Sequence, residues 1–326
     1  MKQLRNGILC GVLLALCLLT GCTQQPEPAP ENPVVVGFSQ LGSESAWRIA
    51  NTQSMEAAAQ KFGYGLMMDN ANQKQEKQIA AIRSFIAYRV DVIIFSPIVE
   101  TGWTHVLREA KNAGIPVILT DRMIESGDED LYTSYVGADF IQEGRKAGEY
   151  LVRKADALGR TTVNVVEISG TIDSTPMRER HQGFMDVIRK DPRFHVVDSI
   201  SGDFLRSKGK ECMAELLRRH GAEGIDVVYS HNDAMTLGAL DVLDAQGIRP
   251  GQDMVIISVD GEKAAVDALR QGRINCIVQC TPDLGEATMG LVQDLVAGRQ
   301  IPKVAHPEES MFTDFDDLTS PQVEGF

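Results

Sequence analysis

Polar and aromatic side chains follow the short apolar runs of this 326-residue chain, where core packing alone would place apolar residues. Carboxylates and amides bind in fixed directions, and an arginine fork bridges two adjacent oxygens, which suits a molecule with neighbouring hydroxyl groups. A flat aromatic side chain such as Trp47 or Phe204 can cover the C–H face of a sugar ring. These residue types predict non-covalent binding of a carbohydrate. The positions concerned are 39–48, 69–70, 96–97, 121–122, 169–180, 203–204, 231–233 and 260.

The stretch GFSQLGSESAWR, residues 37–48, is the most informative of these positions. A turn after the apolar run 34–36 needs only glycine, asparagine or serine. The pair Trp47 and Arg48 indicates that something flat and polar is held there. We interpret the stretch as one wall of a sugar site.

Each of these residues also has a structural interpretation. An aspartate at the end of a strand can cap the following turn, a serine can cap a helix, an asparagine can shape a turn, and an arginine can form a surface ion pair of small energetic value. Trp47 opens an expected helix with a buried face and could belong to the core. Recurrence at equivalent places in both halves of the chain favours the functional interpretation.

Alternating strand and helix patterns position these residues. Between residues 34 and 119, apolar runs of strand length alternate with segments of helical periodicity, which is typical of βαβ units around a buried parallel sheet. The same alternation begins again near residue 164. We expect strands at 34–38, 65–68, 92–95, 115–119, 164–168, 195–200, 227–229, 254–259 and 274–279, and helices at 45–62, 73–88, 103–113, 178–190, 207–219, 234–245 and 286–297.

The repeated pattern predicts an α/β protein with two doubly wound parallel-sheet lobes joined by a hinge of several strands. Ligands of such sheets bind beyond the carboxyl ends of the strands, so two facing rims would form a polar cleft that closes by hinge motion. A late segment would return to complete the first lobe. We expect a first lobe of residues 34–137 plus 280–304, a second lobe of residues 138–279 and a C-terminal tail of residues 305–326.

The N-terminus resembles an export signal. Lys2 and Arg5 precede a short apolar run that ends in the letters LTGC, so we expect residues 1–21 to be a signal peptide. This ending resembles the lipobox of bacterial lipoproteins, which implies that Cys22 is lipidated. The apolar run is short for the alternative, a plain transmembrane anchor. Residues 22–33, rich in Pro, Gln and Glu, are expected to form a tether behind the lipidated cysteine.

Composition disfavours several other classes of protein. The formal net charge is −13, and an acidic chain is a poor partner for nucleic acid, which needs a basic face. Cys212, Cys276 and Cys280 are too few and too scattered for a disulfide framework. The sequence has no Cys-x-x-Cys or His-x-x-x-His spacing, so we expect neither a metal nor a cofactor.

The motifs GFSQLGSESAWR, LTDR, SGDFLRSKGK, SHNDAMTLGAL and SVDG, in this order, resemble those of the type I periplasmic sugar-binding proteins of ABC importers. The nearest branch is the ribose-binding and galactofuranose-binding group, and the resemblance covers residues 34–297. It implies the type I periplasmic binding protein fold. It also implies a sugar site formed by Glu44, Ser45, Trp47, Arg48, Asp121, Arg122, Arg180, Phe204, Asn232, Asp260 and Gln279, with Gln279 near the hinge.

Two positions depart from the galactofuranose-like pattern. Ala46 stands where that pattern has a glycine before the tryptophan, which adds a methyl group near the site. Gln279 stands where that branch has a glutamate and the ribose-like branch has a glutamine. The resemblance therefore implies the class of ligand but leaves open the identity of the sugar and its ring form.

Other functions fit the sequence less well. Asp121 and Asp260 could be imagined as the carboxylate pair of a glycoside hydrolase, but nothing in the sequence marks one of them as the acid, and no nucleophile-elbow, Walker or Gly-x-Gly-x-x-Gly motif is present. We therefore expect no enzyme. A transcriptional repressor of this fold would need a DNA-binding domain where the signal and tether stand. A receptor presenting a sugar, or a furanose-like signal, to a membrane sensor would use the same cleft and stays an alternative.

The predicted function is that of an extracytoplasmic substrate-binding lipoprotein. Open lobes would bind a monosaccharide, contacts from both lobes would stabilise the closed form, and the closed form would dock on a permease. The implied partners are a monosaccharide, the permease and ATPase subunits of an ABC transporter, and a membrane reached through the lipid anchor. Nucleic acid is not among them, and we expect a monomer. The protein is expected in the periplasm or on the extracellular face, anchored by lipid.

Overall fold

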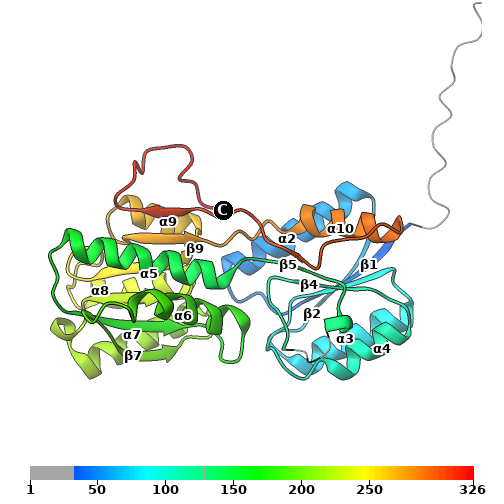
Figure 1. The fold of residues 1–326 in the computed structure, drawn as a ribbon, viewed down its shortest axis with the longest axis horizontal. Helices are drawn as coiled ribbons and strands as arrows, with labels where there is room; N and C mark the ends of the chain where they lie inside the picture. Colours follow the sequence, from blue (N-terminus) through cyan, green and yellow to red (C-terminus); the bar gives the residue numbers. More distant parts are fainter. Residues whose placement is uncertain (1–32, 126, 128) are drawn as a thin grey trace, which may run out of the picture. The chain divides into compact units, whose positions relative to one another are not determined.

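In the part of the chain that the structure describes, two six-stranded sheets form the framework (Figure 1). The computed structural model describes residues 33–125, 127 and 129–326. The expected signal peptide (1–21), the lipidated Cys22 and the tether up to residue 32 lie outside the described residues. Within the described part, no helix combines the length and the apolar character needed to cross a membrane.

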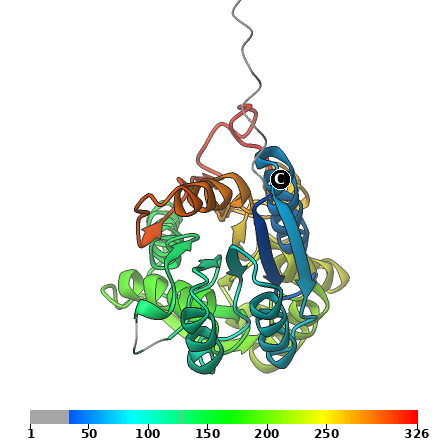
Figure 2. The same ribbon diagram turned by 90° about the vertical axis from the view of Figure 1, so that its right-hand side faces the viewer.

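The first sheet has the strand order β11-β5-β4-β3-β1-β2, and every pair in it is parallel. Its two neighbouring strands β1 and β2 are drawn in blue in Figure 2. The strands are β1 (Val35–Gln40), β2 (Gly65–Asn70), β3 (Val92–Phe95), β4 (Val117–Thr120), β5 (Ser134–Val136) and β11 (Val304–Ala305). The helices packed with them are α2 (Ala46–Phe62), α3 (Gln75–Tyr88), α4 (Thr104–Asn112) and α10 (Gly285–Val296), and η1 (Glu129–Leu131) is a short 3-10 turn. We call this part the first lobe.

Both faces of the first sheet are buried, which explains why its central strands are continuously apolar. Ile94 of β3 packs in the same cluster as Met55 of α2. Its neighbours Ile93 and Phe95 point to the opposite face and pack with residues of α3 and α4. This alternation fixes which side chains remain free at the strand ends.

The second sheet has the strand order β12-β10-β9-β8-β6-β7. All its pairs are parallel except β10 with β12. The strands are β6 (Val163–Ser169), β7 (Phe194–Ser201), β8 (Val227–Ser230), β9 (Val255–Asp260), β10 (Cys276–Gln279) and β12 (Met311–Thr313). The helices are α5 (Phe140–Ala157), α6 (Thr175–Ile188), α7 (Arg206–His220), α8 (Asp233–Ala245) and α9 (Lys263–Arg270), with a 3-10 turn η2 (Ala222–Gly224). We call this part the second lobe, and the predicted fold class is confirmed.

Helix α5 was not predicted, and it packs closely on α6. Two glycines in α5 normally weaken a helix. Here they let the two backbones approach, because a Cβ added at Gly144 would lie 2.2 Å from the carbonyl oxygen of Arg180. A Cβ at Gly183 of α6 would lie 2.0 Å from the carbonyl oxygen of Ile141. The contact places the first turn of α5 beside Arg180.

Within the described residues, the chain passes between the two sheets at three places. The passages are β5 to α5, β10 to α10, and β11 to β12. Helix α10 packs on α2 of the first lobe. Ser54 Oγ of α2 donates to Asp283 Oδ1 over 2.6 Å and accepts from the backbone N–H of Gly285. Residues 305–326, expected to be a tail, include β12, which pairs with β10 in the second sheet.

Candidate functional site

A pocket lies at the carboxyl ends of strands from both sheets. It contains ten of the eleven residues predicted to bind sugar. Gln279 does not line it: its Oε1 accepts from the backbone N–H of Ser310 over 3.1 Å. The lining residues are Glu44, Ser45, Trp47, Arg48, Asp121, Arg122, Pro176, Arg180, Phe204, Asn232, Asp260 and Cys280.

Arg48 is the centre of the polar network of the first lobe. Its Nε lies 3.0 Å from Glu44 Oε1, and its Nη2 lies 2.6 Å from Asp121 Oδ2. Burial opposes the charge of Arg48, but the two carboxylates outweigh that effect and raise its pKa above the ordinary value. Ser96, which follows β3, donates to the same Asp121 oxygen over 3.1 Å. Arg48 and Asp121 are therefore held in fixed positions before any ligand arrives.

Arg122 has donor capacity that the protein does not use. Its Nη1 donates to the carbonyl oxygen of Ile98 over 2.9 Å, and its guanidinium lies 5.2 Å from the centre of the Phe204 ring. Burial and the neighbouring Arg48 lower the pKa of Arg122 to about 10, which leaves it charged at neutral pH. Its buried Nε has no hydrogen-bond partner among the described residues. A buried donor of this kind normally has a partner, and a ligand oxygen in the pocket would supply it.

Arg180 has the corresponding role in the second lobe. Its Nε donates to Glu143 Oε2 over 2.6 Å, and its Nη1 donates to the carbonyl oxygen of His231 over 2.6 Å. Burial opposes its charge, but Glu143 contributes most to raising the pKa of Arg180 well above the ordinary value. Its Nη2 lies 3.9 Å from Asp260 Oδ1, beyond hydrogen-bond distance. Arg180 and Asp260 are thus close enough to contact one ligand together.

Asp260 is placed by an unusual backbone conformation. It is the last residue of β9, has a φ of 124°, and is followed by Gly261 with a φ of 104°. Burial raises the pKa of Asp260 well above its ordinary value, which means that the site disfavours the bare carboxylate. Hydroxyl donors of a bound sugar would compensate for this lost solvation.

Both aromatic residues of the pocket are buried, and each also packs in a core cluster. Trp47 is only 5% exposed and packs in the core, and its Nε1 donates to the carbonyl oxygen of Cys280 over 2.7 Å. Trp47 therefore belongs to the core, and because it also lines the pocket its role in binding stays a prediction. Phe204 has a φ of 61°, and its ring occupies the space beside Gly170. The ring thereby reaches the pocket from the loop after β7.

Two residues of the predicted site also cap helices. Ser45 Oγ accepts from the backbone N–H of Arg48 at the start of α2, over 3.2 Å. Asn232 Oδ1 accepts from the backbone N–H of Met235 at the start of α8, over 3.0 Å. Both residues line the pocket as well, so the capping bond fixes their orientation towards it.

Sequence reasoning missed Glu143, Pro176 and Cys280. Glu143 lies in the first turn of the unpredicted helix α5, although Asp139, which caps it by accepting from Gln142 N, was a usable signal. Pro176 lies within the segment 169–180, which was expected to follow a strand, but it was not named as a binding residue. Cys280 directly follows the predicted strand 274–279 and had no signal beyond that position.

Among the described residues, one group has the geometry for a metal: Glu143, Cys280 and Glu309, with ligand atoms within 4.8 Å of one another. Arg180 already neutralises Glu143. Burial and the nearby Glu143 raise the pKa of Glu309 to about 8. A proton on this carboxyl pair is the simpler compensation, so the residues do not favour a cation.

Comparisons with known proteins identify the family of this chain. The model of the periplasmic binding protein domain matches residues 36–300. The galactofuranose-binding protein YtfQ of Escherichia coli (strain K12) is 42% identical over 253 residues, which are 77% of this chain and 79% of that protein.

Two solved structures are also similar. A Mycobacterium smegmatis protein in complex with β-D-fucofuranose is 45% identical, with a TM-score of 0.83 over 86% of this chain and 92% of that one. The binding component of the arabinose ABC transporter of Shewanella sp. ANA-3, bound to α- and β-L-arabinofuranose, is 40% identical, with a TM-score of 0.82 over 86% of this chain and 91% of that one. The chain belongs to the periplasmic binding protein family.

Proposed function

We propose that this protein is the sugar-binding component of an ABC importer and that its ligand is a monosaccharide in the furanose form. The observation that carries the proposal is the pocket, in which arginines and carboxylates of both lobes converge beside Trp47 and Phe204. Buried Glu44 Oε2 and Arg122 Nε have no hydrogen-bond partner among the described residues, although Arg122 Nε lies 3.8 Å from Asp121 Oδ2 in an ion pair, so the pocket offers both a donor and an acceptor to hydroxyl groups.

The furanose form is proposed because relatives with more than 40% identity are described with it. YtfQ is named a galactofuranose-binding protein, and the M. smegmatis relative holds β-D-fucofuranose. The balance of charge in the pocket supports an uncharged sugar, because Arg48 and Arg180 already contact Asp121 and Glu143.

Binding would proceed by closure of two lobes around the sugar. The proposed first lobe comprises residues 34–137 and 280–304, and the proposed second lobe comprises residues 138–279. The proposed ligand residues of the first lobe are Glu44, Ser45, Trp47, Arg48, Asp121 and Arg122, and those of the second are Arg180, Phe204, Asn232 and Asp260. Gln279 would act near the hinge. Because both lobes contact the sugar, the ligand favours the closed form, which would dock on the permease.

We also propose that the protein acts outside the cytoplasm, as a monomer held to a membrane through lipid on Cys22. The supports are the LTGC ending of the apolar N-terminal run and the Pro-rich segment after it. Metabolic labelling with a palmitate analogue, lost in Cys22→Ser, would test the anchor.

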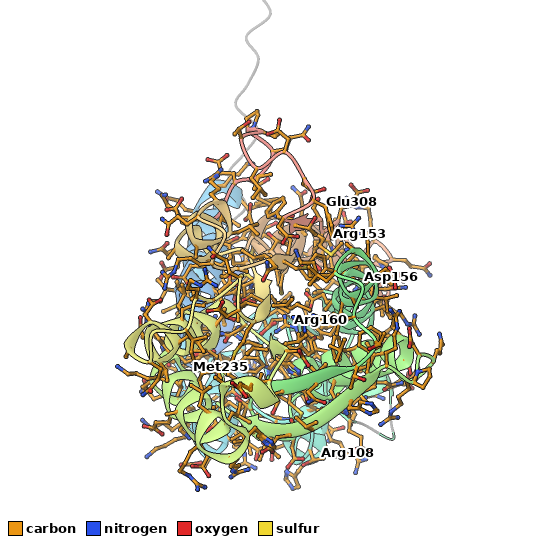
Figure 3. All side chains as sticks on the ribbon, turned by 90° about the vertical axis from the view of Figure 1, so that its left-hand side faces the viewer. Arg108, Arg153, Asp156, Arg160, Met235 and Glu308 are labelled. Carbon is orange, nitrogen blue, oxygen red and sulfur yellow. The ribbon has the colours of Figure 1, made fainter. Side chains whose placement is uncertain are left out.

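Calorimetric titration tests the sugar proposal. The protein without its first 22 residues, unfolded and refolded to remove bound sugar, is titrated with D-galactose, L-arabinose, D-fucose and D-ribose. We expect saturable binding of at least one sugar and its loss in Asp260→Ala. Asp156→Ala, on the exposed side of α5, is the matched control and should bind normally (Figure 3). Absence of binding across the panel would contradict the proposed class of ligand.

A further inference from the structure

The last residues of the chain lie beyond the family match, which ends at residue 300, and yet Phe312, Thr313 and Val323 among them are buried. We call residues 311–326 the C-terminal strap. It begins with β12 on the edge of the second sheet, where Arg153 of α5, labelled in Figure 3, donates to Thr313 Oγ1 over 3.2 Å. Further along, Val323 is buried among residues of the second core cluster, and its carbonyl oxygen accepts from Arg270.

The strap ends on the turn that follows Asp260. The backbone N–H of Phe326 donates to the carbonyl oxygen of Gly261, and the N–H of Lys263 donates to the carbonyl oxygen of Phe326, both over 3.1 Å. Gly325 lies against the same turn: an added Cβ would be 2.6 Å from Lys263 Cα and 3.0 Å from Gly261 O. A side chain at position 325 would therefore push the end of the strap away from the turn.

The turn after Asp260 has a strained backbone conformation. Asp260 has a φ of 124°, which residues with a Cβ rarely adopt, and such conformations persist only where the surroundings hold them. Asp260 also lines the pocket, and its Oδ1 lies 3.9 Å from Arg180 Nη2. A small change in the turn would therefore move a carboxyl group that faces the ligand.

Asp233 holds the turn from the protein interior. Its Oδ2 accepts from the backbone N–H of Gly261 over 2.7 Å and from that of Glu262 over 2.6 Å, while its Oδ1 accepts from Ser258. The strap bonds to the other backbone group of Gly261, its carbonyl oxygen, which accepts from the N–H of Phe326. The two backbone groups of this glycine are thus bonded on different sides, one by Asp233 and one by the strap.

We propose that the C-terminal strap is a positioning element of the sugar site, which acts by holding the turn after Asp260 so that its carboxyl group faces the pocket. This inference rests on the proposed function, with Asp260 as a sugar ligand. Gly325 is then a positioning residue: its lack of a side chain allows the contact with Lys263 and Gly261. The strap contributes to affinity without touching the sugar.

The experiment compares Gly325→Ala and Gly325→Val with the unchanged protein, by calorimetric titration with the same four sugars. We expect the dissociation constant to rise about tenfold in Gly325→Val, on the scale of one lost hydrogen bond to a charged group, and less in Gly325→Ala. Gly290→Ala and Gly290→Val are the matched controls, because a Cβ at Gly290 of α10 meets nothing within 4 Å. Unchanged affinity in both position-325 variants would overturn the proposal.

A second measurement separates positioning from a general loss of structure. The same substitution is made in Asp260→Asn, which weakens the ligand contact while keeping the size of the side chain. If the strap acts through Asp260, Gly325→Val causes little further loss in that background; an equal loss in both backgrounds would contradict the proposal. Failure of the unchanged protein to bind any of the sugars would instead contradict the proposed function.

Discussion

Glu100 and Arg178 form an ion pair that joins the two lobes beside the pocket. Arg178 Nη2 lies 2.8 Å from Glu100 Oε1, and Arg178 Nε lies 3.2 Å from both carboxylate oxygens. The backbone N–H of Glu100 also donates to the carbonyl oxygen of Asp173 over 2.9 Å. Thr175 Oγ1 accepts from Met123 N and donates to Met123 O, over 3.1 and 3.0 Å. These direct contacts therefore hold the two lobes together beside the pocket.

Glu100→Gln should weaken sugar binding although Glu100 does not line the pocket. The apparent affinity depends on the fraction of molecules in the binding-competent form, and loss of the ion pair lowers that fraction. Because the Arg178 side chain is 51% exposed, we expect a loss of about two- to fivefold, the scale of a partly exposed pair. Titration of Glu100→Gln, Arg178→Gln and the double variant would measure it.

The matched control for this pair is Glu215→Gln, which breaks ion pairs with Arg218 and Arg219 on α7. Sugar affinity should not change in this control. Two single losses that simply add in the double variant would show that Glu100 and Arg178 act separately, contrary to the prediction.

Arg122→Ala should cost at least about 1.5 kcal/mol of binding free energy, the scale of a charge-assisted hydrogen bond. The reason is the buried Nε of Arg122, which has no hydrogen-bond partner in the described part of the chain and is available to donate to a ligand oxygen. Arg122→Lys keeps the charge but not the planar fork, so it should restore only part of the affinity. The control is Arg108→Ala, on the exposed side of α4 (Figure 3). Calorimetric titration that gives equal affinities for Arg122→Ala and the unchanged protein would remove Arg122 from the site.

Gly170→Ala should displace Phe204 from the pocket. An added Cβ at position 170 would lie 1.9 Å from Phe204 Cζ, so the ring has to move. Because Arg122 lies over the same ring, we expect weaker sugar binding together with a loss of stability of about 1–3 kcal/mol, typical of an overpacked site. Urea unfolding and titration of the same sample would measure both quantities. Retention of full affinity would show that the Phe204 ring does not contribute to binding.

The fold was predictable because its signals are local and repeated. Apolar runs such as Val92–Phe95 coincide with strands whose two faces are buried, and helix starts such as Ser45 carry a capping side chain. The parallel topology then brings together the residues that directly follow each strand, since the carboxyl ends of parallel strands meet at one edge of the sheet. This is why the predicted residues, apart from Gln279, line one pocket.

The rest of the site depends on contacts between distant segments. Glu143 reaches Arg180 only because Gly144 lets α5 approach α6, and no periodicity in the sequence shows that contact. Beyond β12 the C-terminal strap is irregular and largely polar, and Val323 is its one buried residue there, so its sequence has the composition of a tail. Gln279 ends the predicted strand as expected, but its side chain bonds to the backbone of Ser310 in the third passage between the lobes.

Glu309 makes the stability of the protein depend on pH. Burial, together with the nearby Glu143, raises the pKa of Glu309 to about 8, while Arg180, Lys146 and the N–H of Thr281 partly oppose this shift. The folded protein thus holds a proton that the unfolded chain releases near its ordinary pKa of 4.5. Since the folded state binds more protons between these values, the free energy of unfolding falls as pH rises from about 4.5 to about 8.

Glu309→Gln should remove this contribution, because an amide resembles the protonated carboxyl group and does not titrate. We expect the variant to gain stability relative to the unchanged protein as the pH is raised from 5 to 8, measured by urea unfolding at both values. Glu308→Gln is the matched control: Glu308 is the exposed neighbour on the same segment, and this change should leave the pH dependence as it is. If the free energy of unfolding falls by the same amount between pH 5 and pH 8 in the unchanged protein and in Glu309→Gln, Glu309 does not bind the proton of the folded state.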